Sequence, residues 1–176
     1  MSNNLKIRLF TVPNMLTLAN LLAGCIAIIF TLVYHAYETA FWLIVAAAVF
    51  DFLDGFAARL LKQTSPLGVQ LDSLADDISF GLAPAVVMFD IYSQSTTYYG
   101  ISSDIMEPLG YLTLIIAAFS ALRLAKFNID KRQTTTFIGL PTPANALFWA
   151  SLVVGYGDFI YGLNYGWLLM IGLVLL

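Results

Sequence analysis

Long apolar segments fill almost the whole chain, and they constrain the fold more than any other feature. Of the 176 residues, 60% are hydrophobic and only 11% are charged, whereas a soluble domain carries about 25% charged residues. The chain has too few charged side chains to cover a water-facing surface. Its apolar runs are long enough to cross a bilayer as helices, so we predict an all-α integral membrane protein.

The apolar runs predict six membrane spans. A span needs roughly 20 mostly apolar residues, and five runs meet this: Val12–Tyr34, Thr39–Leu61, Val69–Tyr92, Leu109–Phe127 and Ala144–Tyr161. A sixth run begins near Tyr165 and reaches Leu176, which is only about 18 Å of helix. We therefore predict a six-transmembrane-helix bundle whose last helix is truncated, and we expect the natural protein to continue. Residues 1–176 are predicted to form one membrane-embedded domain.

The basic residues are confined to one side of this predicted bundle. They lie before the first span, between the second and third, and at and after the end of the fourth: Lys6, Arg8, Arg59, Lys62, Arg123, Lys126, Lys131 and Arg132. The positive-inside rule then places the N-terminus in the cytoplasm. Aromatic residues such as Tyr34, Trp42 and Tyr92 are interpreted as an outer interfacial belt. With so few basic residues, no nucleic-acid partner is expected.

Aspartates inside the second and third predicted spans are the main functional signal. A carboxylate within a span costs at least ~2.5–3.5 kcal/mol on insertion scales, so such residues usually mark function. Helical spacing predicts two stripes, each on one helical face: Asp51, Asp54, Gly55 and Ala58 on the second span, and Gly68, Asp72 and Asp76 on the third. The short link containing Pro66 makes the two helices antiparallel neighbours. We therefore expect the stripes to face each other near the cytoplasmic surface.

Converging carboxylates repel each other unless a cation neutralises them. Oxygen ligands without Cys or His favour Mg²⁺, Mn²⁺ or Ca²⁺, and small residues between the carboxylates let a phosphorylated ligand approach the backbone. The pattern predicts a metal-assisted phosphate site. In one alternative, the aspartates cap helices, as Asp72 could, and the small residues only pack helices. In another alternative, the aspartates belong to a cation transporter. A transporter would need its carboxylates distributed along a path through the membrane.

The two stripes together resemble the signature of the CDP-alcohol phosphatidyltransferases. The matching pattern is Asp51-x₂-Asp54-Gly55-x₂-Ala58-Arg59-x₈-Gly68-x₃-Asp72-x₃-Asp76. The resemblance implies a six-helix core, two divalent cations, a CDP-linked lipid and a homodimer. It also implies that Asp51, Asp54, Asp72 and Asp76 hold the metals and that Asp76 is the catalytic base. It assigns Gly55, Ala58, Arg59 and Gly68 to the nucleotide, although Arg59 could instead snorkel to the interface.

Further segments are similar to one branch of this family, the phosphatidylserine synthases. They are Val12–Thr17, Ser79–Pro84, Ala121–Asn128 and Gly139–Ala144. The chain departs from the pattern at Asp77, which adds a carboxylate. The resemblance implies transfer of a phosphatidyl group from CDP-diacylglycerol to L-serine, with release of CMP, at the cytoplasmic face of a prokaryotic inner or plasma membrane. Glycerol 3-phosphate or an inositol phosphate is the alternative acceptor.

The acceptor is expected near the end of the fourth span. Arg123 and Lys126 are three residues apart there, and Arg123 could bind the serine carboxylate. Asn128 could add a hydrogen bond. The alternative interpretation is that these basic residues contact lipid headgroups. Asp77 lies ~100° around the helix from Asp76, and we expect it to support the site indirectly or to pair with a basic residue.

Overall fold

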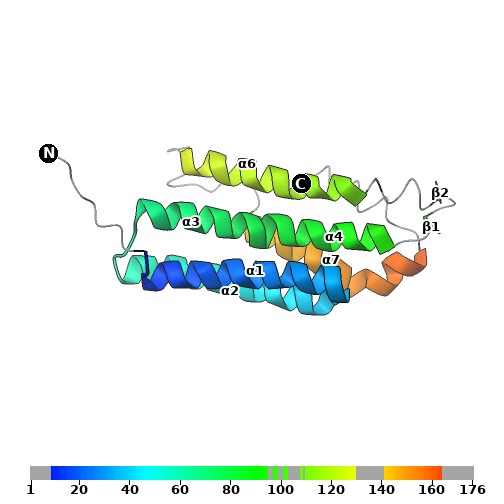
Figure 1. Ribbon diagram of the computed structural model, residues 1–176, viewed down its shortest axis with the longest axis horizontal. Coiled ribbons are helices and arrows are strands. Elements are labelled where there is room, and N and C mark those ends of the chain that lie inside the picture. The colour runs from blue at the N-terminus through cyan, green and yellow to red at the C-terminus, as the bar shows by residue number, and fades with distance from the viewer. Residues whose placement is uncertain are drawn as a thin grey trace.

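The computed structural model describes residues 9–94, 97–98, 101–102, 108, 110–129 and 141–163, and these form an elongated helical bundle (Figure 1). The elements in chain order are α1 (Val12–Tyr34), α2 (Tyr37–Leu60), α3 (Pro66–Asp76), the π-helical η1 (Asp77–Leu82), α4 (Ala83–Gln94), β1 (Thr97–Tyr98), β2 (Ile101–Ser102), the 3₁₀-helical η2 (Tyr111–Leu114), α6 (Ile115–Ile129) and α7 (Thr142–Leu163). The two short strands pair as an antiparallel hairpin.

The helices agree with a membrane protein. Among the described residues, three helical segments are long and apolar enough to cross a membrane: Val12–Tyr34, Tyr37–Leu60 and Tyr111–Ile129. The third predicted span corresponds to α3, η1 and α4, which follow one another without a break, and the fifth corresponds to α7. The predicted sixth span, from Tyr165, lies outside the described residues.

Local sequence signals determine where α1 and α3 begin. Thr11 caps α1 by accepting a hydrogen bond from the backbone N–H of Asn14, and a proline follows in the first turn. Ser65 caps α3 in the same way, with its Oγ 3.0 Å from the backbone nitrogen of Gly68, and Pro66 comes next. Both pairs combine a preferred cap residue with proline in the first turn. The interpretation of Asp72 as a helix cap is therefore wrong, because Asp72 lies inside α3.

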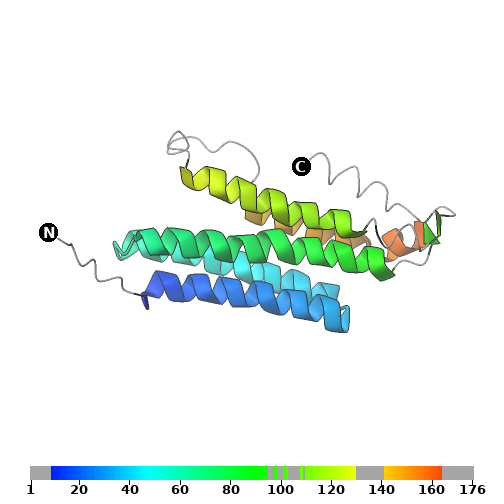
Figure 2. The ribbon, with the colours of Figure 1, turned by 45° about the horizontal axis from the view of Figure 1, so that its top comes forward.

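The helix α1 lies beside both α2 and the α3–η1–α4 segment (Figure 2). It approaches η1 closely at Gly24, where an added Cβ would lie 2.7 Å from Cα of Ser79. Real Cβ atoms essentially never approach so closely, so glycine is required for this contact. The same pair of elements is joined by a hydrogen bond from the Ser79 hydroxyl to the carbonyl oxygen of Asn20, at 3.0 Å.

Apolar side chains form a core in one part of the bundle and also cover much of its outside. The largest buried side chains include Trp149, Tyr92, Phe80 and Ile44. Many other large apolar side chains are exposed, for example Leu22, Phe52 and Leu122, as expected for surfaces that face lipid. Buried polar side chains gather on the inner faces of α1, α2 and α3: Asn14, Thr17, Asn20, Asp54 and Asp76.

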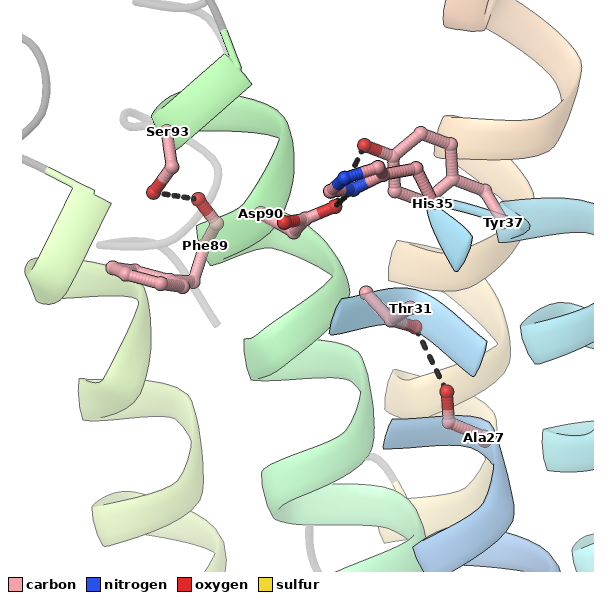
Figure 3. A network of polar contacts seen from close by, with 7 residues as sticks. All are labelled: Ala27, Thr31, His35, Tyr37, Phe89, Asp90 and Ser93. Carbon is pink, nitrogen blue, oxygen red and sulfur yellow. Dashed lines mark hydrogen bonds and ion pairs between the residues drawn. The ribbon is translucent and has the colours of Figure 1, made fainter. Parts of the chain in front are cut away.

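A second polar cluster joins the α1–α2 turn to α4 (Figure 3). The carboxylate of Asp90 is buried, and its Oδ2 lies 2.7 Å from Nδ1 of His35 and 2.9 Å from the hydroxyl of Tyr37. His35 ends α1 in the left-handed conformation, with φ of 49°. Tyr92 does not belong to an interfacial belt, because it is 1% exposed and packs in the core. Tyr34 and Trp42 are exposed, as that interpretation required.

We expect Asp90→Ala to destabilise the bundle without changing catalysis. The substitution removes the acceptor that the Tyr37 hydroxyl and the His35 ring share, and a hydrogen bond to a charged group contributes roughly 1.5–3 kcal/mol. The melting temperature in detergent should fall, while kcat measured well below that temperature should stay within about twofold of the wild type. A loss of kcat without a lower melting temperature would contradict this structural role.

Candidate metal and phosphate site

Three aspartates from α2 and α3 converge as the spacing predicts. One carboxylate oxygen from each of Asp51, Asp72 and Asp76 lies within 4.8 Å of the other two. Asp76 is buried, with 8% of its surface exposed, and the other two are half-buried. The predicted meeting of the two stripes is therefore confirmed for these three residues. Three like charges this close are stable together only if protons or cations offset their repulsion.

The fourth predicted metal ligand, Asp54, is near this group but makes a different contact. Its Oδ2 accepts a hydrogen bond of 2.6 Å from the hydroxyl of Thr17 on α1, and its side chain is buried. Asp54 and Asp72 line the same pocket. The structure thus places three carboxylates in one cluster and the fourth at the edge of an adjoining pocket.

The pocket has a volume of about 230 Å³ and lies between the ends of α1, α2 and α3. All four residues predicted to contact the nucleotide line it: Gly55, Ala58, Arg59 and Gly68. A Cβ added to Gly55 would meet only the Arg59 guanidinium, at 4.0 Å, whereas one on Gly68 would lie 3.3 Å from Asn14 and Ser65 side-chain oxygens. The absence of a side chain at Gly55 therefore leaves open space in the pocket.

The helix α1 contributes two polar side chains that we did not assign to the site from the sequence. The amide nitrogen of Asn20 donates to Oδ1 of Asp76 at 3.1 Å, and Thr17 donates to Asp54. Both side chains are buried. Their signal in the sequence is a three-residue spacing of Asn14, Thr17 and Asn20 within an otherwise apolar run. That pattern marks a polar face on α1 but does not say which residues it meets.

Asp77 is separate from the carboxylate cluster. Its Oδ1 lies 2.9 Å from the position that a Cβ on Gly81 would occupy, and Cβ of Ser120 on α6 lies 3.0 Å from that position. Asp77 therefore faces the contact between η1 and α6. The π-helical turn begins at this residue, and such turns occur frequently at functional sites.

The residues predicted to bind serine lie along α6 beside the site. Gly81 is close to Ser120, and the Asn128 amide donates to the Ser73 hydroxyl at 2.8 Å, so α6 runs antiparallel to α3 and η1. Eight residues separate the two contact points on each side of this pair, Ser120 to Asn128 and Gly81 to Ser73. The part of α6 between them, which holds Arg123 and Lys126, is therefore level with Asp76 and Asp77. Arg123 is half-buried, whereas Lys126 and Asn128 are exposed.

The donor set fits a hard divalent cation. The cluster offers only carboxylate oxygens, which Mg²⁺, Mn²⁺ and Ca²⁺ prefer. One oxygen of Asp72 is buried and has no hydrogen-bond partner among the described residues, as expected for an atom that binds a cation. The clustered aspartates are confined to the half of the bundle nearest the α2–α3 link rather than distributed along a path through it, which disfavours the transporter alternative.

Comparisons with known proteins agree with this chemistry. A family model described as CDP-alcohol phosphatidyltransferase matches residues 10–176. Three relatives are named CDP-diacylglycerol–serine O-phosphatidyltransferase. The one from Bacillus subtilis (strain 168) is 38% identical over 132 residues, which are 75% of this chain and 69% of the relative. The one from Helicobacter pylori (strain J99) is 34% identical over 79% of this chain and 55% of its own length. The one from Methanocaldococcus jannaschii is 32% identical over 96% of this chain and 72% of its own length. This chain therefore belongs to the CDP-alcohol phosphatidyltransferase family.

Proposed function

We propose that this protein transfers the phosphatidyl group of CDP-diacylglycerol to the hydroxyl of L-serine, giving phosphatidylserine and CMP. The observation that carries the proposal is the cluster of Asp51, Asp72 and Asp76 beside a pocket lined by small residues. Family membership supports the phosphatidyl transfer, and the names of the relatives support serine as the acceptor. We propose that residues 1–176 form one catalytic domain.

In this proposal the cytidine diphosphate of the donor occupies the pocket, and its acyl chains stay in lipid. Gly55, Ala58 and Gly68 let the nucleotide lie against the helix backbones, and Arg59 offers a positive charge at the pocket wall. Asp51, Asp54, Asp72 and Asp76 would hold two divalent cations, Mg²⁺ or Mn²⁺, with Ca²⁺ as a further option. Bound there, the cations would supply positive charge that offsets the pyrophosphate and the departing CMP.

Asp76 is the proposed general base. Its carboxylate is buried, faces the cluster, and is fixed on one side by Asn20. It takes the proton from the serine hydroxyl while the serine oxygen forms a bond to the lipid-bearing phosphorus. The bond from that phosphorus to the CMP oxygen breaks, and CMP leaves with the electron pair. No covalent enzyme intermediate is required.

This direct route has a clear test. If serine attacks the donor directly, the purified protein should not exchange labelled CMP into CDP-diacylglycerol when serine is absent, and with serine it should form CMP and phosphatidylserine in equal amounts. Rapid exchange of CMP without serine would instead reveal a phosphatidyl-enzyme intermediate, and the proposed route would be wrong.

Arg123, Lys126 and Asn128 are the proposed serine-binding residues. Their part of α6 is level with Asp76, and Asn128 also holds the end of α6 against α3. A guanidinium can bind a carboxylate through two parallel hydrogen bonds, which a Lys ammonium cannot do. Arg123 is therefore assigned to the serine carboxylate, and Lys126 adds positive charge.

We expect Arg123→Ala to raise the KM for serine by about 10–100-fold, because a hydrogen bond to a charged group contributes roughly 1.5–3 kcal/mol. The Kd for CDP-diacylglycerol should stay nearly unchanged. Measuring both constants in neutral detergent separates this role from contact with lipid headgroups, which predicts an unchanged serine KM and an altered dependence on anionic lipid.

We expect Gly55→Leu to abolish donor binding while the bundle stays folded. The leucine side chain would extend into the open pocket space beside Arg59. The helix itself should tolerate the change, since Leu is a better helix former than Gly by up to ~1 kcal/mol. Donor binding and the melting temperature should be compared with those of Gly155→Leu, a control on α7 where an added Cβ meets nothing within 4 Å. Normal donor binding by a folded Gly55→Leu protein would contradict our placement of the nucleotide.

We further propose that the N-terminus and the active site face the cytoplasm, that the membrane is a prokaryotic inner or plasma membrane, and that the protein is a homodimer. The orientation is supported by Arg59, Lys62 and Lys126, which lie at the helix ends nearest the pocket. Figure 1 shows the α2–α3 link and the end of α6 at the same end of the bundle as the start of α1.

A further inference from the structure

Asn20 is a completely buried polar residue of α1 that touches the proposed base but has no role of its own in the proposed reaction. Its amide nitrogen donates to Oδ1 of Asp76 at 3.1 Å, across 56 residues of sequence. A carboxylate that binds a cation only accepts hydrogen bonds, so the NH₂ group is the end of the amide that suits such an Asp76. The amide oxygen points elsewhere and has no hydrogen-bond partner among the described residues.

The backbone of Asn20 is held in place independently of its side chain. The Ser79 hydroxyl donates to the carbonyl oxygen of Asn20 at 3.0 Å. One helical turn further along α1, Gly24 permits the close contact with Ser79. Asn20 therefore projects from a close contact between α1 and η1. On the other side of that contact, Ser79 is only three residues along the chain from Asp76. A side chain anchored this way can hold the carboxylate in one orientation.

Packing alone does not explain an amide at this position. A buried oxygen without a partner reduces stability, and an apolar side chain of similar size would avoid that penalty. Among the residues that the structure describes, the side chain of Asn20 makes one hydrogen bond, and its partner is Asp76. Partners of this kind, which bind a metal ligand rather than the metal, typically fix the orientation of that ligand.

We propose that Asn20 is a positioning residue, which orients the Asp76 carboxylate so that the acidic cluster can bind a divalent cation. This inference rests on the proposed function in one respect, namely that Asp76 is a metal ligand as well as the base. It adds a requirement from α1 to a site whose proposed ligands all lie on α2 and α3.

The test measures Mn²⁺ binding to purified protein in detergent, by calorimetry or electron paramagnetic resonance, without either substrate. Asn20→Ala removes the donor and leaves a gap, whereas Asn20→Leu removes the donor and restores most of the volume. Both variants should bind Mn²⁺ about 10–100-fold more weakly than the wild type. Thr31→Ala is the matched control, because Thr31 is a completely buried polar residue of the same helix. Within the described part of the chain, its hydroxyl bonds to the Ala27 carbonyl oxygen and to no other group (Figure 3). This variant should bind Mn²⁺ within about twofold of the wild type.

Melting temperatures separate positioning from a general loss of structure. The proposal expects Asn20→Ala to melt no lower than Thr31→Ala while losing Mn²⁺ affinity. It is overturned if Asn20→Leu regains the affinity that Asn20→Ala loses, since the role would then be packing. It is also overturned if weak Mn²⁺ binding by Asn20→Ala accompanies a much lower melting temperature, or if both variants bind like the wild type. In this last case the proposed function survives, whereas wild-type protein that does not bind Mn²⁺ would refute the metal site itself.

Discussion

Asp76→Asn should lower kcat by about 10²–10⁴-fold, the usual contribution of a general base. Asparagine has nearly the shape of aspartate and keeps one oxygen toward the cluster, but it cannot take a proton from the acceptor hydroxyl. Asp76 is the most buried member of the three-carboxylate cluster and is also bonded to Asn20. The variant should therefore stay folded and keep some binding of CDP-diacylglycerol, while turnover is lost even at saturating Mn²⁺ and donor.

The neighbouring carboxylate provides a matched control for this result. Asp77 is adjacent in sequence but faces the contact with α6 rather than the cluster. Asp77→Asn should keep kcat within a few-fold of the wild type when both variants are assayed at saturating donor and serine. Near wild-type kcat for Asp76→Asn, or an equal loss in both variants, would mean that Asp76 is not the base.

Removal of divalent cations should abolish turnover completely, and added Mn²⁺ or Mg²⁺ should restore it. At 4.8 Å, two carboxylates repel each other by roughly 3 kcal/mol at an effective dielectric constant of 20, and the phosphates of the donor would add more negative charge. Without cations, the site can bind neither the pyrophosphate nor the departing CMP effectively. The rate should be measured with excess chelator and with the same chelator saturated with Mg²⁺ beforehand. An undiminished rate in excess free chelator would rule out the metal site.

Local patterns were enough to predict most of the helices. The first predicted span, Val12–Tyr34, coincides with α1, because the cap at Thr11, the following proline and the left-handed His35 all act on adjacent residues. The meeting of Asp51 with Asp72 and Asp76 was predictable from helical spacing and a short link, which together allow only a narrow range of arrangements. Both kinds of inference depend on residues that are close in sequence.

Contacts between distant residues could not be predicted in the same way. Thr17 meets Asp54 across 37 residues and Asn20 meets Asp76 across 56, and the apolar run of α1 does not reveal which helix its polar face contacts. The burial of Tyr92 was missed for a related reason, since an aromatic residue near a predicted span end is equally consistent with an interface or a core position. The π-helical turn after Asp76 was also not predicted, and it packs against α1 and α6, which are both distant in sequence.

The central claim is that serine is the alcohol that accepts the phosphatidyl group, and CMP release from CDP-diacylglycerol tests it most directly. Purified protein with Mn²⁺ should release CMP rapidly with L-serine and at no more than a background rate with glycerol 3-phosphate, an inositol phosphate or no acceptor. The lipid product formed with serine should be phosphatidylserine. Faster CMP release with either phosphorylated alcohol than with serine would contradict the proposed acceptor, and no release with any of them would contradict the proposed transfer.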